Sequence, residues 1–438
     1  MQCISRGLCI CGVILALSSC AQNKKLPQGE RISILEESFD LTASASSSIA
    51  SLPQPFSNPS WTQNGMVASH VVGNLKANPT LNEIWRENFG EGINKRDILL
   101  SAPVVLDNRV FVMDAKGKVS AFNQDNGTLL WENILTSKSR STTESKSKAS
   151  GLAADNSLVF ATTGFGGVFA MDAITGKPKW RKILESPIRI APVVTPAMIL
   201  VQTVDNKLYA LDKMTGNELW RFGVAFEDTV IAGGASPSFD AENNIVVAGF
   251  SNGEIVILNA NIGTPLWAHS LVSNQKVSSA TEINTISSYP IVEEGNIYAI
   301  SNSNKMLALD IRTGDVIWEK EIGSMQNMLL AGDYLFVISN RNILYAIDKY
   351  EGDIVWSLDI KNHIADKDIK GEIYSSQPVM INGNILLAFS NGQVFKINAY
   401  KGNLVAKMDL GVDISNGLIV AKGNVVGISD DADVIVFE

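Results

Sequence analysis

Cysteine is absent from most of this sequence, and histidine is scarce. All four cysteines lie in the first twenty residues: Cys3, Cys9, Cys11 and Cys20. The three histidines are far apart in the chain: His70, His269 and His363. A domain formed by the residues after Cys20 therefore has no disulfide, no cysteine-based zinc site and no thiol nucleophile. The scarcity of histidine also disfavours a histidine-rich metal site or a metallohydrolase centre.

Basic residues are outnumbered as well. The 438 residues include 36 Lys and Arg against 45 Asp and Glu, which gives a formal net charge of −9. Nucleic acid and anionic membrane surfaces are bound by clustered Lys and Arg, so neither is expected as the main partner. Only 18% of the chain is charged and 45% is hydrophobic, a balance that allows a sizeable core and excludes disorder of the whole chain.

The N-terminal apolar run is too short to cross a membrane. It covers residues 7–17, directly after Arg6, whereas a helix needs about 20 residues to span a bilayer core. This length is typical of the apolar region of a signal peptide. The next residues, Leu-Ser-Ser-Cys20, resemble the lipobox of bacterial lipoproteins. The resemblance implies cleavage before Cys20 and lipidation of that residue, and the lack of Asp after it implies the outer membrane. An ordinary signal peptide is the alternative.

A flexible linker is predicted between Cys20 and the folded body. Residues 20–77 include a Ser/Ala-rich run and three prolines that favour an extended chain: Pro53, Pro55 and Pro59. A second polar tract, residues 136–150, carries four bases against one acid. We interpret this tract as a solvated loop. The alternative is a basic contact loop for an acidic partner or for anionic lipid headgroups.

One sequence motif recurs in the remainder of the chain. It consists of an apolar stretch, then Asp or Asn, three residues, Gly, three residues and Trp. The glycines of its seven copies are Gly127, Gly176, Gly216, Gly263, Gly314, Gly352 and Gly402. The tryptophans are Trp131, Trp180, Trp220, Trp267, Trp318 and Trp356, with Trp85 on a lone strand before the first copy and Ala406 in place of Trp in the seventh.

Each part of the motif has a physical role in a β-strand or a turn. The apolar stretch favours a β-strand. Asp or Asn at its end can hydrogen-bond its own following backbone and start a turn, and the Gly suits a turn position with positive φ. The Trp then falls on the returning strand, where it can lie across a neighbouring sheet. A buried Trp covers about 150–250 Å².

The repeats predict a closed ring. Two further strand signals precede each motif, so each repeat unit has four short strands in about 46 residues, as in a β-propeller blade. Three strand signals after residue 413 lack a fourth, and residues 81–90 supply a lone strand; joined, they make one more blade. We therefore predict an all-β, eight-bladed propeller over residues 78–438, closed by strands from both termini, after a signal peptide (1–19) and linker (20–77). Seven blades are the alternative.

The repeat resembles that of pyrroloquinoline-quinone (PQQ) propellers, and its combination with a lipobox resembles the BamB family. The WTQNG motif at residues 61–65 also resembles that family. The resemblance implies a non-enzymatic lipoprotein, without cofactor or metal, of the machinery that folds β-barrels into the bacterial outer membrane. It implies anchoring on the periplasmic side and binding to the POTRA region of BamA. Other subunits of the assembly complex and unfolded outer-membrane proteins are further expected partners.

The resemblance also implies two partner-binding loops, residues 229–237 and 282–290. The residues predicted to contact BamA are Thr229, Ile231, Ala232, Gly233, Thr285 and Ser287. Ala232 stands where the family pattern has Arg, and Thr285 and Ser287 stand where it has acids. The docking mode is therefore expected without its salt bridges, with Ile231 as an apolar anchor. Ordinary loop packing at the start of a blade is the alternative interpretation.

Two other functions compete with this one. A PQQ-dependent dehydrogenase would share the repeats, but the vicinal disulfide typical of those enzymes cannot form in a body without cysteine. A nucleophile elbow, a phosphate-binding loop and a dinucleotide-binding fingerprint are also missing from the sequence. The third possibility is a propeller that binds carbohydrate or peptidoglycan, which exposed aromatic residues on one face would support.

Overall fold

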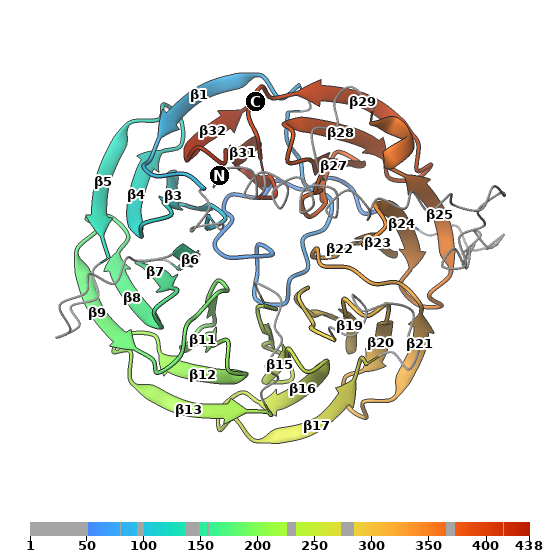
Figure 1. The fold of residues 1–438 in the computed structure, drawn as a ribbon, viewed down its shortest axis with the longest axis horizontal. Coiled ribbons are helices and arrows are strands. Elements are labelled where there is room, and N and C mark those ends of the chain that lie inside the picture. The colour runs from blue at the N-terminus through green and yellow to red at the C-terminus, as the bar shows by residue number, and fades with distance from the viewer. Residues whose placement is uncertain are drawn as a thin grey trace, which may run out of the picture. The chain divides into compact units, whose positions relative to one another are not determined.

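The chain folds into an all-β ring of eight blades (Figure 1). The computed structural model describes residues 51–78, 80–93, 100–135, 149–155, 157–225, 234–272, 284–364, 373–414 and 416–438. Within these residues, each blade is one four-stranded antiparallel sheet, and the only helix is the short 3-10 turn η2 (Lys361–His363). The prediction of an eight-bladed propeller is confirmed, and the seven-bladed alternative is wrong.

In blades 1 to 7 the strands follow in chain order from the innermost to the outermost. Blade 1 has β2 (Val104–Leu106), β3 (Arg109–Met113), β4 (Lys118–Asn123) and β5 (Leu129–Ile134). Blade 2 has β6 (Ala149–Ala154), β7 (Leu158–Thr163), β8 (Gly167–Asp172) and β9 (Pro178–Ile183). Blade 3 has β10 (Val193–Val194), β11 (Met198–Gln202), β12 (Lys207–Asp212) and β13 (Glu218–Gly223). Blade 4 has β14 (Ser238–Asp240), β15 (Ile245–Gly249), β16 (Glu254–Asn259) and β17 (Pro265–Ser270).

The second half of the ring repeats this arrangement. Blade 5 has β18 (Ile291–Glu293), β19 (Asn296–Ile300), β20 (Met306–Asp310) and β21 (Val316–Lys320). Blade 6 has β22 (Leu329–Ala331), β23 (Tyr334–Ile338), β24 (Ile343–Asp348) and β25 (Ile354–Asp359). Blade 7 has β26 (Val379–Ile381), β27 (Asn384–Ala388), β28 (Gln393–Asn398) and β29 (Leu404–Asp409). Blade 8 has β30 (Ile419–Ala421), β31 (Asn424–Ile428), β32 (Asp433–Phe437) and, outermost, β1 (Glu83–Asn88).

Blade 8 closes the ring with strands from the two ends of the described chain. The outer strand β1 pairs antiparallel with β32, and Trp85 lies opposite Val436. The main chains of Asn82 and Glu438 exchange hydrogen bonds of 3.0 and 2.9 Å at the end of this pair. The closure predicted from the split repeat is confirmed, and it removes the open sheet edge that an unclosed ring would expose.

The tryptophans of the repeat join each blade to the next. In blade 1, the Trp131 indole Nε1 donates to the Ala173 carbonyl of blade 2 at 3.2 Å. Its ring lies so close to Gly176 that a Cβ there would come within 2.5 Å of the indole, and Gly176 also has a φ of +68°. Only glycine suits both conditions. The same contact recurs in seven pairs: Trp85/Gly127, Trp131/Gly176, Trp180/Gly216, Trp220/Gly263, Trp267/Gly314, Trp318/Gly352 and Trp356/Gly402.

The one missing tryptophan lies at the closure. Ala406 is on β29, the outer strand of blade 7, and the blade that follows is the split one. In every other blade, a turn with its glycine joins the third strand to the outer strand. In blade 8 the chain ends at Glu438 instead, and β1 enters separately. An indole at position 406 would therefore find no turn glycine to cover.

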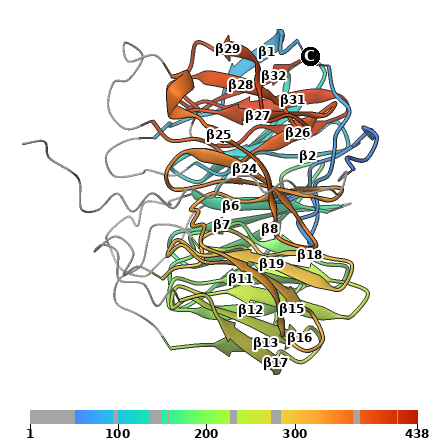
Figure 2. The ribbon, with the colours of Figure 1, turned by 90° about the vertical axis from the view of Figure 1, so that its right-hand side faces the viewer.

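Residues 51–77 form a strap that runs once around the inside of the ring. The strap hydrogen-bonds to the innermost strand of every blade, in the ring order 8, 1, 2, 3, 4, 5, 6, 7. Its contacts are Asn58 with Val420, Trp61 with Val105, Thr62 with Ala154, Gln63 with Val194, Ala68 with Phe239, Ser69 with Val292, Gly73 with Leu330 and Leu75 with Met380. Figure 2 shows this segment, in blue, at one face of the ring.

The strap is packed as well as hydrogen-bonded. Trp61 is 3% exposed and Leu75 is completely buried, and both belong to the largest hydrophobic cluster of the protein. The sequence predicted a flexible linker through residue 77, but its described part, residues 51–77, is built into the propeller. The strap therefore lies against the innermost strands on the inner side of the ring.

Candidate partner-binding face

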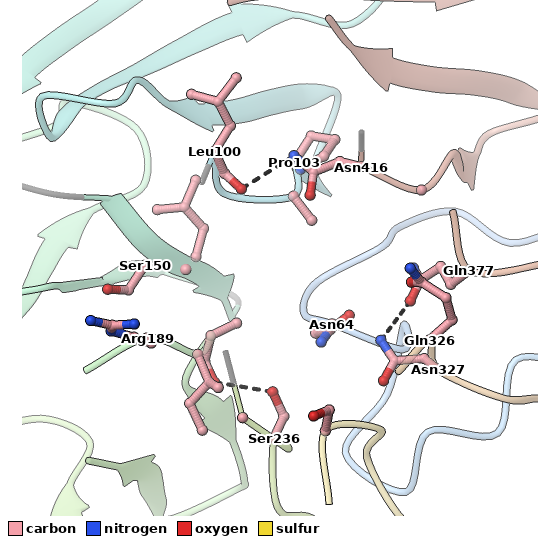
Figure 3. Close-up of a pocket in the computed structure, with 18 of the residues that line it drawn as sticks. Asn64, Leu100, Pro103, Ser150, Arg189, Ser236, Gln326, Asn327, Gln377 and Asn416 are labelled. Carbon is pink, nitrogen blue, oxygen red and sulfur yellow. Dashed lines mark hydrogen bonds between the residues drawn. The ribbon is translucent and has the colours of Figure 1, made fainter. Parts of the chain in front are cut away.

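A polar funnel, lined by residues of all eight blades, opens on one face of the ring (Figure 3). The funnel is a cavity of about 250 Å³, and its wall is made by the residues that lead into the innermost strands. Asn64 of the strap lies inside the ring of wall residues in Figure 3. The labelled residues of the wall are Leu100, Pro103, Ser150, Arg189, Ser236, Gln326, Asn327, Gln377 and Asn416.

Some of the wall residues are held by hydrogen bonds between blades. Asn327 Nδ2 donates to Gln377 Oε1 at 2.8 Å, which joins blade 6 to blade 7. Asn416 Nδ2 donates to the Leu100 carbonyl at 3.2 Å, which joins blade 8 to blade 1. The Tyr289 main-chain N–H also donates to Asn327 Oδ1 at 3.0 Å, which joins blade 5 to blade 6. These bonds hold the side-chain amides of Asn327, Gln377 and Asn416 in place.

The two predicted partner loops are only partly within the described residues. Thr229, Ile231, Ala232 and Gly233 lie outside them, so their contacts with BamA stay predictions. The described remainder is Gly234–Pro237 and Asn284–Pro290, and it contributes Gly234, Ser236 and Ser287 to the funnel wall at blades 4 and 5. Gly234, Thr285 and Ile286 also line a smaller cavity of about 30 Å³ between blades 3 and 4. The structure therefore brings the ends of the two loops together on the open face.

Thr285 and Ser287 differ in their surroundings. Thr285 is 1% exposed, and its hydroxyl donates to the Ser251 carbonyl at 3.4 Å, so it faces the interior of the ring. Ser287 lines the funnel, and its hydroxyl oxygen is buried without a hydrogen-bond partner among the described residues. A partner docked on this face would meet Ser287 more directly than Thr285. The role of both in binding stays a prediction.

His70 of the strap contacts the ends of both loops. Its ring is completely buried and is stacked on Tyr289 with 4.0 Å between ring centroids. Nε2 lies 3.1 Å from the Pro237 carbonyl and Nδ1 lies 3.0 Å from the Asn64 carbonyl. Pro237 ends the first loop and Tyr289 belongs to the second. One strap residue therefore fixes the positions at which both loops join their blades.

The charge state of His70 couples this contact to pH. Burial lowers the pKa of His70 to about 4, although its two carbonyl partners would favour a protonated ring. Burial also raises the pKa of the neighbouring Tyr289, which stays neutral. In the unfolded chain the pKa of histidine is about 6.5, so between these values the unfolded state binds a proton that the folded state does not. The contribution of neutral His70 to the free energy of unfolding is therefore fully present above the unfolded pKa, and it is lost progressively as the pH decreases.

As the pH is lowered from 6.5 to 4, we expect proton uptake by His70 in the unfolded chain to lower the free energy of unfolding by about 1.4 kcal/mol per pH unit. His70→Gln removes the titration and should flatten this part of the pH profile, although the variant is less stable at pH 7. The measurement is denaturant unfolding of both proteins at several pH values. Parallel profiles for the two proteins would show that His70 does not titrate as a buried neutral residue.

Sequence reasoning missed His70 and the funnel for different reasons. His70 lies in the segment predicted to be a linker, where no burial was expected. The wall residues carry a signal that the repeat comparison could have found, since small or polar residues recur just before several innermost strands. Ser236, Asn327, Gln377 and Asn416 are such residues.

The described residues show no other obvious chemical site. No group of three or more His, Cys, Asp or Glu among them could hold a metal ion. No helix in the described part of the chain is long and apolar enough to cross a membrane.

Comparisons with known proteins identify similar sequences. The model of a family described as outer membrane protein assembly factor BamB matches residues 77–149 and 115–358. The BamB protein of Moranella endobia is 26% identical over 330 residues, which are 74% of this chain and 82% of that protein. The BamB protein of Yersinia pestis is 24% identical over 333 residues, 75% of this chain and 81% of that protein.

Solved structures support the fold. The crystal structure of BamB from Moraxella catarrhalis matches with a TM-score of 0.67 and 20% identity, over 82% of this chain and all of that one. A quinohemoprotein alcohol dehydrogenase from Comamonas testosteroni also reaches 0.67, with 15% identity, over 86% of this chain and 80% of that one. The ring is therefore shared by assembly factors and enzymes, and its shape alone does not separate the two functions.

Proposed function

The chain belongs to the family of the outer membrane protein assembly factor BamB, and we propose that it is a non-enzymatic scaffold of the barrel assembly complex. In this proposal it binds the periplasmic POTRA region of BamA and assists the folding and insertion of outer-membrane proteins. Other subunits of the complex and unfolded outer-membrane proteins are further proposed partners. The observation that carries the proposal is the meeting of segments 234–237 and 284–290 on one open face of the ring.

A lipid anchor would place this face in the periplasm. The proposed anchor is Cys20, whose acyl chains would hold the protein on the inner leaflet of the outer membrane. Each buried CH₂ contributes roughly 0.8 kcal/mol, so a single acyl chain binds a membrane only marginally. Stable anchoring therefore needs more than one chain. The relatives described above are named outer membrane protein assembly factors, which supports an association with the outer membrane.

The scaffold is favoured over a dehydrogenase for two reasons. The curated relatives that cover about three quarters of this chain are named as assembly factors, whereas the dehydrogenase shares the fold at 15% identity. The body of the chain also has no cysteine for the vicinal disulfide typical of the quinone enzymes. The tryptophans and glycines of the repeat join neighbouring blades, so their presence does not distinguish a scaffold from an enzyme.

The proposal is tested by isolating the complex. A tagged full-length lipoprotein, extracted from membranes in mild detergent, should carry the BamA homologue of the same cell, identified by mass spectrometry. An unrelated tagged outer-membrane lipoprotein is the control for non-specific recovery. Recovery of the tagged protein without BamA, under conditions that keep BamA soluble, would refute the proposed partner.

Ile231→Asp is expected to lower the recovery of BamA at least tenfold. The resemblance assigns Ile231 as an apolar anchor, and an acid there would place a charge in an apolar contact. Ile174→Asp is the matched control, because Ile174 is 66% exposed on an outer turn of blade 2 away from the funnel rim. Equal recovery with both variants would exclude the loop of residues 229–237 from the interface.

A further inference from the structure

The funnel has the form of a receptor for a short polar segment. It opens on the face of the ring where segments 234–237 and 284–290 contribute Gly234, Ser236 and Ser287 to its wall. We expect an occupant to enter from this face. A volume of about 250 Å³ holds a few residues of a loop, and it is too small for a domain.

The wall offers hydrogen-bonding groups that the protein itself does not use. The side chains of Asn64 and Gln326 make no hydrogen bond to any residue that the structure describes. Side-chain amides present both a donor and an acceptor, as a peptide group does. No aromatic side chain is among the described residues of the wall, which disfavours a sugar ring as the occupant.

The charge of the wall differs from that of the whole protein. The chain has nine more acids than bases, yet the described residues that line the funnel include no Asp or Glu. Arg189 is the one charged residue among them, and it is exposed at the rim beside Ser150 (Figure 3). Arg189 makes no ion pair with any described residue. A guanidinium in this position favours a carboxylate and disfavours a cation.

We propose that the funnel is part of the partner interface and receives a polar loop of the docked partner, with an acidic side chain of that loop facing Arg189. This inference rests on the proposed function, because the loop belongs to the protein that docks on segments 234–237 and 284–290. The amides of the wall pair with the peptide groups of the loop, and Arg189 fixes its orientation at the rim. Charge complementarity at this rim thus replaces the salt bridges that Thr285 and Ser287 cannot make.

The test measures binding and contact separately. Purified full-length protein is titrated with the periplasmic region of its BamA homologue, with Arg189→Glu and Arg189→Lys as variants. Arg189→Glu should weaken binding at least tenfold, and Arg189→Lys should weaken it by less than threefold. Arg221→Glu is the matched control and should bind normally, since Arg221 lies on the outer strand β13 with 58% of its side chain exposed.

Photo-crosslinking tests the contact directly. A benzoyl-phenylalanine at Gln326 in the wall should crosslink to BamA, whereas one at Leu266 on the outer strand β17 should not. If the wild-type protein binds BamA but Arg189→Glu binds equally and position 326 gives no crosslink, the funnel inference is wrong and the proposed function stands. If the wild-type protein does not bind, both are wrong. Circular dichroism and thermal melting establish that each variant is folded.

Discussion

Trp131→Ala is expected to lower the free energy of unfolding by about 3–5 kcal/mol. The indole is 9% exposed, lies 5.8 Å from the Phe111 ring between centroids, and covers Gly176 of the next blade. Its truncation removes this burial and the hydrogen bond to Ala173, and leaves a gap between blades 1 and 2. Denaturant unfolding followed by tryptophan fluorescence and circular dichroism measures the change.

Leu130→Ala is the matched control for this prediction. Leu130 precedes Trp131 on the same outer strand but is 44% exposed, so its truncation should cost less than about 0.5 kcal/mol. Ala406→Trp provides a second control and should give no increase in stability, because the following blade lacks the turn glycine. Equal effects at positions 130 and 131, or a clear gain at 406, would contradict the account of how blades are joined.

Replacing the strap, residues 51–77, by a Gly/Ser sequence of equal length should lower the midpoint of thermal unfolding by roughly 10 °C. The loss of buried Trp61 and Leu75 alone is expected to cost about 5–10 kcal/mol, before the loss of hydrogen bonds to all eight blades. Because a ring of this size has a large unfolding entropy, each kcal/mol shifts the midpoint by only about 1–2 °C. Scanning calorimetry measures the shift.

The predicted linker supplies the control for the strap. Replacing residues 21–50 by a Gly/Ser sequence should leave the unfolding midpoint unchanged, since that stretch is predicted to be a tether. Hydrogen exchange adds a local readout, because loss of the strap should raise exchange in the innermost strands of every blade. An unchanged midpoint and unchanged exchange after loss of residues 51–77 would mean that the strap contacts contribute nothing to the ring.

The fold could be predicted because its signals are local and repeated. The spacing from Asp or Asn to Gly to Trp marks one turn and one outer strand, and seven copies make the assignment secure. The closure of the ring could be predicted from two incomplete repeat units. One is the lone strand with Trp85, and the other is the set of three strands after residue 413. The Trp-to-Gly contact between neighbouring blades, by contrast, needs the three-dimensional ring, since each pair joins residues about forty positions apart.

The strap and the funnel could not be predicted in the same way. The strap has no strand periodicity, because it touches a different blade at nearly every contact and its hydrogen bonds are spaced by the geometry of the ring. Its prolines and small residues looked like those of a linker. The funnel is assembled from single residues that lead into separate blades, such as Ser236, Asn327 and Gln377. The signal-peptide boundary at residue 19 and the lipidation of Cys20 stay predictions.

As a binding scaffold, this ring should bind BamA directly. The most direct measurement is the binding of the purified chain, without its signal and lipid, to the purified POTRA region of the BamA homologue from the same cell. We predict a saturable one-to-one complex that is weakened by Ile231→Asp and not by Ile174→Asp. Absence of binding with folded partners, or binding that is equally insensitive to both variants, would contradict the account.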